Sequence, residues 1–228
     1  MKRIVFLAAL LLMAVSAQAQ IVSSSSRRIV DRPVGNRYIK AGAAFQHASF
    51  KYNWGGTSPN LSLGYNVLFG VQNPIDGNGL FWGLEAGVGT RGCNDGNASV
   101  LHHGIKVSPN IGYKFELDSD LAVDLRLGAF VSFDFAGGAE RLLITEGHEW
   151  LFDYDLYNIN ANLFDLGVIP GITLWYQRFG LDFSYQQGFI NLLEKSKRIE
   201  YDTNGYTFPY IAEGGPASSF NLSLLYRF

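Results

Sequence analysis

The sequence has little charge, almost no cysteine and no excess of cations. Asp, Glu, Lys and Arg make up 17% of the 228 residues, compared with roughly 25% in an ordinary soluble domain. The single cysteine, Cys93, cannot form an intramolecular disulfide or a cysteine-built metal site. The formal net charge of −2 gives no electrostatic basis for nucleic-acid binding. These shortages exclude a disulfide-stapled domain and disfavour a nucleic-acid partner.

Long apolar runs are also missing after the amino terminus. Residues 1–19 begin with Lys2 and Arg3, continue with an apolar run from Ile4 to Val15, and end in small residues. This order is typical of a cleaved signal peptide, with cleavage expected after Ala19. A helix needs about 20 apolar residues to cross a membrane, and no such run follows. The sequence therefore predicts an exported protein without membrane-spanning helices.

From residue 37 onward, apolar and polar residues alternate with a period of two, which indicates strands with two chemically different faces. Residues 20–36 are polar and predict a flexible periplasmic lead. We place strands near 37–49, 60–72, 80–91, 100–117, 121–136, 164–177, 181–192 and 218–228. The even number of strands favours an all-β, eight-stranded antiparallel up-and-down transmembrane β-barrel over residues 37–228.

The two faces of these strands differ in charge. None of the positions on the apolar face is Asp, Glu, Lys or Arg. The opposite face carries six cations and six anions among glycines: Lys40, Arg91, Lys106, Lys114, Arg126 and Arg227 with Glu85, Glu116, Asp124, Asp134, Asp165 and Asp182. A cation at the bilayer midplane costs about 2–4 kcal/mol. We therefore expect the apolar face to contact lipid and the charges to form a network in a narrow, filled lumen.

The connections and the aromatic residues support this topology. Short turns at 118–120 and 178–180 alternate with long connections at 137–163 and 193–217, as periplasmic turns alternate with extracellular loops in outer-membrane barrels. Aromatic residues of the apolar face gather toward the two strand ends, as in interfacial girdles. The Asn204-Gly205 turn signal predicts that the last two strands continue as a hairpin above the membrane.

Two prolines, Pro109 and Pro170, lie within the alternating segments. Proline cannot donate a hydrogen bond to a neighbouring strand, so it belongs at bulges or edges. We expect a bulge or kink at each position, and the number of strands would fall if both strands broke there.

The final segment, from Phe220 to Phe228, alternates toward a terminal aromatic residue. With the signal peptide and the eight segments, it resembles the small Gram-negative outer-membrane β-barrels of the OmpA/OmpX type and the porin-family outer-membrane β-barrel proteins. The resemblance implies location in the outer membrane and contact with its lipids. It also implies recognition by the barrel assembly machinery through the signal Leu222, Leu224, Tyr226 and Phe228.

Three functions stay open. The first is a non-catalytic structural or surface-interaction role, in which 137–163 and 193–217 contact an extracellular protein or surface ligand, with no cofactor or metal. The second is a lipid A-modifying, deacylase-like enzyme, since a histidine and a serine spaced like His47 and Ser49 occur in such barrels. That chemistry also needs an acidic partner, and the sequence identifies none. The third is a narrow gated pore.

Overall fold

The computed structural model describes residues 37–52, 57–75, 78–94, 98–145, 148–155, 161–194 and 211–228. The predicted signal peptide at 1–19 and the lead at 20–36 lie outside these residues and stay predictions. None of the described residues belongs to a helix that is long and apolar enough to cross a membrane.

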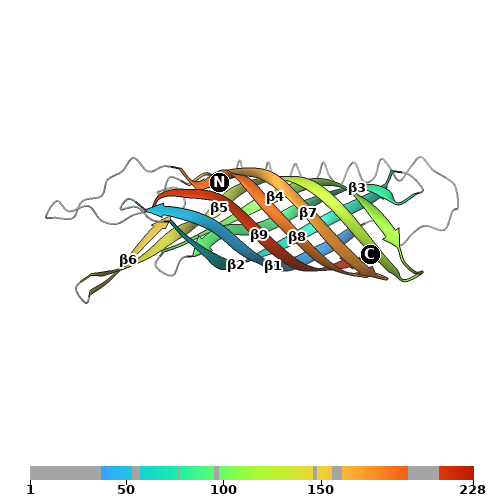
Figure 1. Cartoon of the computed structure of the whole chain (residues 1–228), viewed down its shortest axis with the longest axis horizontal. Helices are drawn as coiled ribbons and strands as arrows, with labels where there is room; N and C mark the ends of the chain where they lie inside the picture. Colours follow the sequence, from blue (N-terminus) through green and yellow to red (C-terminus); the bar gives the residue numbers. More distant parts are fainter. Residues whose placement is uncertain are drawn as a thin grey trace. The chain divides into compact units, whose positions relative to one another are not determined.

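The described residues form nine strands in chain order: β1 (Arg37–Tyr52), β2 (Thr57–Pro74), β3 (Leu80–Asn94), β4 (Ala98–Glu116), β5 (Leu121–Thr145), β6 (His148–Asp155), β7 (Phe164–Tyr176), β8 (Phe179–Leu193) and β9 (Ile211–Arg227). Each strand pairs antiparallel with its neighbours, in the order β4-β3-β2-β1-β9-β8-β7-β5. A further pairing between β4 and β5 closes the sheet (Figure 1). The predicted eight-stranded up-and-down barrel is confirmed.

The ninth strand, β6, corrects the prediction that 137–163 is a loop. β5 continues to Thr145, and β6 pairs with it from Thr145↔His148 to Gly138↔Asp155. This hairpin lies at the end of the barrel opposite the carboxyl terminus (Figure 1). Residues 148–155 do alternate, but the acidic residues among the aromatic ones make the segment look like a polar loop. The hairpin predicted around Asn204 falls within 195–210, outside the described residues.

The two prolines do not produce bulges. Pro109 keeps its register with Leu84 in β3, and Pro170 keeps its register with Leu127 in β5. On its other side, each proline interrupts the pairing for two residues without shifting the register. The Ser108 hydroxyl donates a hydrogen bond of 2.9 Å to the Ala129 carbonyl, which lies opposite Pro109 in this register.

Of the expected bulge or kink, the bulge was therefore wrong at both prolines, and neither strand breaks. A side-chain hydroxyl replaces the hydrogen bond that the Pro109 nitrogen cannot donate. The register shift between β4 and β5 lies instead at His103 and Gly104.

The distribution of side chains is the reverse of that in a soluble protein. Apolar side chains are exposed on the outside, including Leu63 at 69% and Leu127 at 57% exposure. Polar and charged side chains are buried inside, including Asp182 at 0% and Glu85 at 1%. The lumen is narrow enough that a Cβ atom at Gly70 would collide with the ring of Tyr38.

Two apolar layers lie at different levels of the lumen. One consists of Tyr38, Trp175 and Leu225, packed together with Ala122. The other consists of Ala48, Cys93, Val100, Leu192, Leu193 and Ala217. Because Ala48 and Tyr38 lie near opposite ends of β1, the two layers enclose the polar middle of the lumen between them.

Candidate functional site

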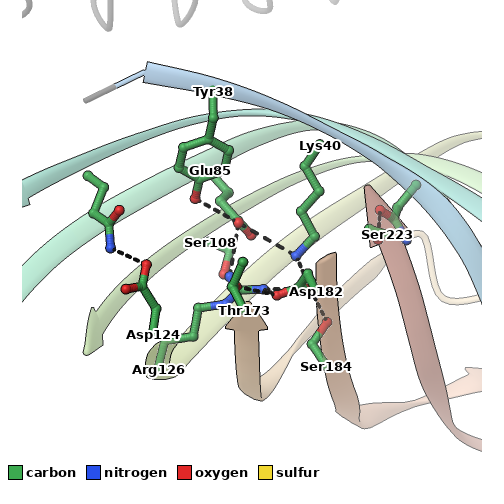
Figure 2. Close-up of polar contacts among 12 residues, drawn as sticks. Tyr38, Lys40, Glu85, Ser108, Asp124, Arg126, Thr173, Asp182, Ser184 and Ser223 are labelled. Atoms are coloured by element: carbon green, nitrogen blue, oxygen red, sulfur yellow. Dashed lines mark hydrogen bonds and ion pairs between the residues drawn. The ribbon is translucent and has the colours of Figure 1, made fainter. Parts of the chain in front are cut away.

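The centre of the lumen holds a cluster of four charged residues from four strands: Lys40 of β1, Glu85 of β3, Arg126 of β5 and Asp182 of β8. The Arg126 guanidinium lies 2.9 Å from Glu85 Oε1 and 2.7 Å from Asp182 Oδ2 (Figure 2). Lys40 Nζ lies 2.6 Å from Asp182 Oδ1 and 3.6 Å from Glu85 Oε1. Two cations therefore face two carboxylates, and the central cluster is neutral as a whole.

Neutral donors complete the central cluster. The Tyr38 hydroxyl donates to Glu85 at 2.8 Å. The hydroxyls of Thr173 and Ser184 donate to the two oxygens of Asp182 at 2.9 and 3.1 Å (Figure 2). Removing two charges from water costs more than their attraction returns unless further hydrogen bonds satisfy them. Here the serine, threonine and tyrosine supply those bonds.

A second polar group surrounds Asp124, near the ends of the strands that bear the short turns. Trp175 Nε1 donates to Asp124 Oδ2 at 2.7 Å, and Gln72 Nε2 donates to the same oxygen at 2.9 Å. Arg227 donates to Gln72 at 3.1 Å and stacks its guanidinium 3.8 Å from the centre of the Trp175 ring. This group links β2, β5, β7 and β9 across the lumen.

A third polar group lies toward the opposite end. Arg91 Nε contacts Asp134 Oδ2 at 2.5 Å, and Arg91 Nη1 lies 3.7 Å from Asp165. His102 Nδ1 lies 3.0 Å from Asp134 Oδ2. Arg91 also donates to the backbone carbonyl of Asn162, just before β7. These contacts hold the segment that enters β7 against the barrel wall.

Most of the charged residues predicted for the lumen are placed there. Nine of them are buried: Lys40, Glu85, Arg91, Lys106, Asp124, Arg126, Asp134, Asp165 and Asp182. Lys106 donates to Gln186 at 2.9 Å. Lys114 and Arg227 are half-buried, whereas Glu116 is exposed at the end of β4, outside the network. The last residue of a strand extends beyond the neighbouring strands that would bury its side chain. Alternation alone therefore wrongly included Glu116 in the network.

Sequence reasoning missed several uncharged members of these groups, above all Tyr38, His102 and Trp175. Each occupies an inward position of its strand, in phase with the charged residues. The alternation that selected the charges would have selected these residues too. Their contacts with Glu85, Asp134 and Asp124, respectively, could not be predicted, because these partners lie 47, 32 and 51 residues away in the sequence.

The lumen has almost no free volume at its centre. The cavity beside the central cluster measures about 10 Å³ and is lined by Lys40, Asn66, Leu68, Glu85, Lys106, Ile169, Ser184 and Asn221. This volume is close to the minimum that holds one water molecule. The described side chains therefore fill the barrel at this level.

His47 and Ser49 lie on the outward face of β1, where His47 is half-buried and Ser49 is exposed. The Ser218 hydroxyl donates to the backbone carbonyl of His47 at 3.5 Å. No described acidic side chain bonds to the His47 ring or to Ser49. Among the described residues, the arrangement needed for acyl hydrolysis is therefore not assembled.

The arrangement of histidines, cysteine and acidic residues also bears on metal binding. No group of three or more His, Cys, Asp or Glu residues there has the geometry to hold a metal ion. His102 and His103 lie on opposite faces, since His102 is buried beside Asp134 whereas His103 Nδ1 lies 3.1 Å from the Tyr65 hydroxyl on the outside.

The residues predicted as the assembly signal lie in the last strand and directly after it, on the outward face. Leu222, Leu224, Tyr226 and Phe228 are all exposed. The Phe228 backbone nitrogen donates to the Arg37 carbonyl at 3.1 Å, which joins the two ends of the barrel sequence.

Comparison with known proteins gives likenesses to solved structures alone. No protein-family model and no curated protein matches the sequence. Neisserial surface protein A is 17% identical, over 86% of this chain and 100% of its own, with a TM-score of 0.45. Ail, the attachment invasion locus protein of Yersinia pestis, is 15% identical, over 86% and 99%, with a TM-score of 0.38. The outer membrane protease OmpT from Escherichia coli is 10% identical, over 89% and 100%, with a TM-score of 0.33. The chain is similar to these three proteins, at values that assign it neither a family nor an activity.

Proposed function

We propose that this protein is an integral outer-membrane β-barrel with a non-catalytic role in surface interaction. The reversed distribution of side chains carries the proposal. Exposed Leu, Val, Ile and Phe residues cover the outside of all eight barrel strands, whereas nine charged residues are buried in the lumen. An apolar surface of this extent is unstable in water and stable in a bilayer.

The hairpin of β5 and β6 supports the interaction role. Within the described residues, β6 pairs along one edge with β5 and has no neighbour on its other edge. An unpaired edge can add a strand from another polypeptide. The acidic positions Glu149, Asp153 and Asp155 on this strand favour a partner with a basic extended segment. The proposed contact surface is therefore the hairpin within 137–163, together with 193–217.

The filled lumen supports a role that needs no solute pathway. An eight-stranded barrel is only wide enough for side chains to fill, and the central cavity here measures about 10 Å³. Planar-bilayer recordings are expected to show no stable large conductance, and a stable open pore would contradict this part of the proposal.

The non-catalytic part of the proposal is tested separately at His47 and Ser49. Refolded protein incubated with lipid A is expected to release no fatty acid. Release that is abolished by Ser49→Ala would replace the interaction role with the acyl-hydrolase alternative.

Membrane location and topology are tested by fractionation and surface proteolysis of intact cells. The protein is expected in the outer-membrane fraction, and protease added outside should cleave within the β5–β6 hairpin. A protease site engineered into the turn at 118–120 is the matched control, since it should be cut only after the outer membrane is permeabilised. Recovery as a soluble periplasmic protein would refute the proposal.

A further inference from the structure

Strands β7, β8, β9 and β1 are successive neighbours in the sheet (Figure 1). A groove of about 500 Å³ opens on their outward face. It is lined by Phe45, Pro170, Gly171, Ile172, Phe183, Ser184, Tyr185, Phe220, Asn221 and Leu222. Its volume lies within the usual range for small-molecule sites, about 300–1,000 Å³. The lining is mostly aromatic and aliphatic, which suits a hydrocarbon chain.

The groove has identifiable structural causes. Pro170 interrupts the pairing of β7 with β8, although the register continues on both sides of it. Across β8 and β9, the rings of Tyr185 and Phe220 contact each other with their centres 4.8 Å apart. The outward side chains of Phe45 and Ile172 are about half exposed, at 44% and 50%. The groove is thus a depression bordered by rings that project from neighbouring strands.

A row of three polar residues lies directly above the groove, on the side toward the β5–β6 hairpin. Ser218 pairs with Gln187 of β8 and with His47 of β1, so the three residues are adjacent across the sheet. Each lies two residues beyond a ring of the groove, on the same outward face. The Tyr185 hydroxyl donates to Gln187 Oε1 at 2.8 Å, which connects the row to the groove.

We propose that the groove and the polar row together bind one diacyl phospholipid with a zwitterionic headgroup. An acyl chain occupies the groove. The headgroup oxygens accept hydrogen bonds from the His47 ring and from the second amide hydrogen of Gln187, whose first is donated to the Gly188 carbonyl at 2.8 Å. The Ser218 oxygen, whose proton is donated to the His47 carbonyl, accepts from the headgroup ammonium. The inference rests on the proposed function, because the groove faces hydrocarbon only if the barrel spans a membrane.

The charge of the site selects the class of lipid. Neither the groove nor the polar row contains Lys or Arg. Lipids with several phosphates are held by such cations through charge-assisted hydrogen bonds. A zwitterionic headgroup carries its own ammonium and needs only neutral donors and acceptors, as the amide, hydroxyl and imidazole here provide.

The test is titration of the refolded full chain with phosphatidylethanolamine in detergent, followed by native mass spectrometry. Ile172→Trp fills the groove, whereas Ile111→Trp makes the same change on the outward face of β4, away from the groove. We expect one retained lipid per protein, about tenfold weaker retention in Ile172→Trp, and unchanged retention in Ile111→Trp. Gln187→Leu should weaken the retention of phosphatidylethanolamine. The same variant should not change the retention of diacylglycerol, because diacylglycerol lacks the headgroup phosphate.

Equal retention by the two tryptophan variants would overturn the inference, as would preferential retention of lipid A or no stoichiometric lipid at all. Insertion into lipid vesicles is measured on the same samples, by the heat-dependent migration of the folded barrel on gels. A protein that inserts but retains no lipid refutes this inference alone. A protein that does not insert refutes the proposed function.

Discussion

Replacing Arg126 by methionine tests whether charge balance in the lumen stabilises the barrel. The guanidinium lies 2.9 Å from Glu85 and 2.7 Å from Asp182, and all three side chains are almost entirely buried. Without it, the central cluster changes from neutral to a net charge of −1, because Lys40 alone then faces two carboxylates. Removal of one partner from a buried pair costs about 3–5 kcal/mol, so we expect Arg126→Met to lower the free energy of unfolding by that amount.

The matched control combines Arg126→Met with Glu85→Gln. In this double variant the central cluster is again neutral and keeps the 2.6 Å pair between Lys40 and Asp182. The glutamine at position 85 also keeps an oxygen that can accept the hydrogen bond from the Tyr38 hydroxyl. It should recover about 2 kcal/mol of the loss, because the two residues are directly coupled. Both free energies come from urea unfolding in phospholipid vesicles, followed by tryptophan fluorescence. A loss below about 1 kcal/mol in the single variant, or a larger loss in the double variant, would refute the reasoning.

Three further substitutions, the first with a matched control, test other features of the barrel. Leu127→Arg places a charge on the middle of the apolar outside and should cost about 2–4 kcal/mol, whereas Glu116→Arg at the exposed end of β4 should change the unfolding free energy by less than about 1 kcal/mol. Ser108→Ala removes the hydrogen bond to the Ala129 carbonyl and should cost about 1 kcal/mol; no change would mean that Pro109 needs no substitute donor. Trp175→Phe removes the donor 2.7 Å from a buried carboxylate and should cost about 1.5–3 kcal/mol, measured by the same urea titration with the remaining tryptophans as reporters.

Much of the fold was predictable from the sequence, because a strand's alternation decides which side chains share a face. Residue by residue, Lys40, Glu85, Arg126 and Asp182 occupy inward positions in the strands that the pattern predicts. The predicted starts at residues 37, 80, 121 and 164 coincide with the starts of β1, β3, β5 and β7. The alternation gave a wrong prediction in two places. At the exposed end of β4, Glu116 lies outside the network, and in β6 the acidic residues made a strand resemble a loop.

The sequence by itself therefore determined the class of fold, the number of barrel strands and the chemistry of each face, because these follow from a local period of two. Only the tertiary structure decided which charges meet. Arg126 reaches Glu85 and Asp182 across 41 and 56 residues of sequence, and those contacts depend on the register at which the barrel closes. The uninterrupted register at Pro109, the outward groove beside Pro170 and the β5–β6 hairpin were decided in the same way. The physical reason is that alternation gives each residue a side of the sheet, whereas its neighbours are set by the alignment of strands that lie far apart in the chain.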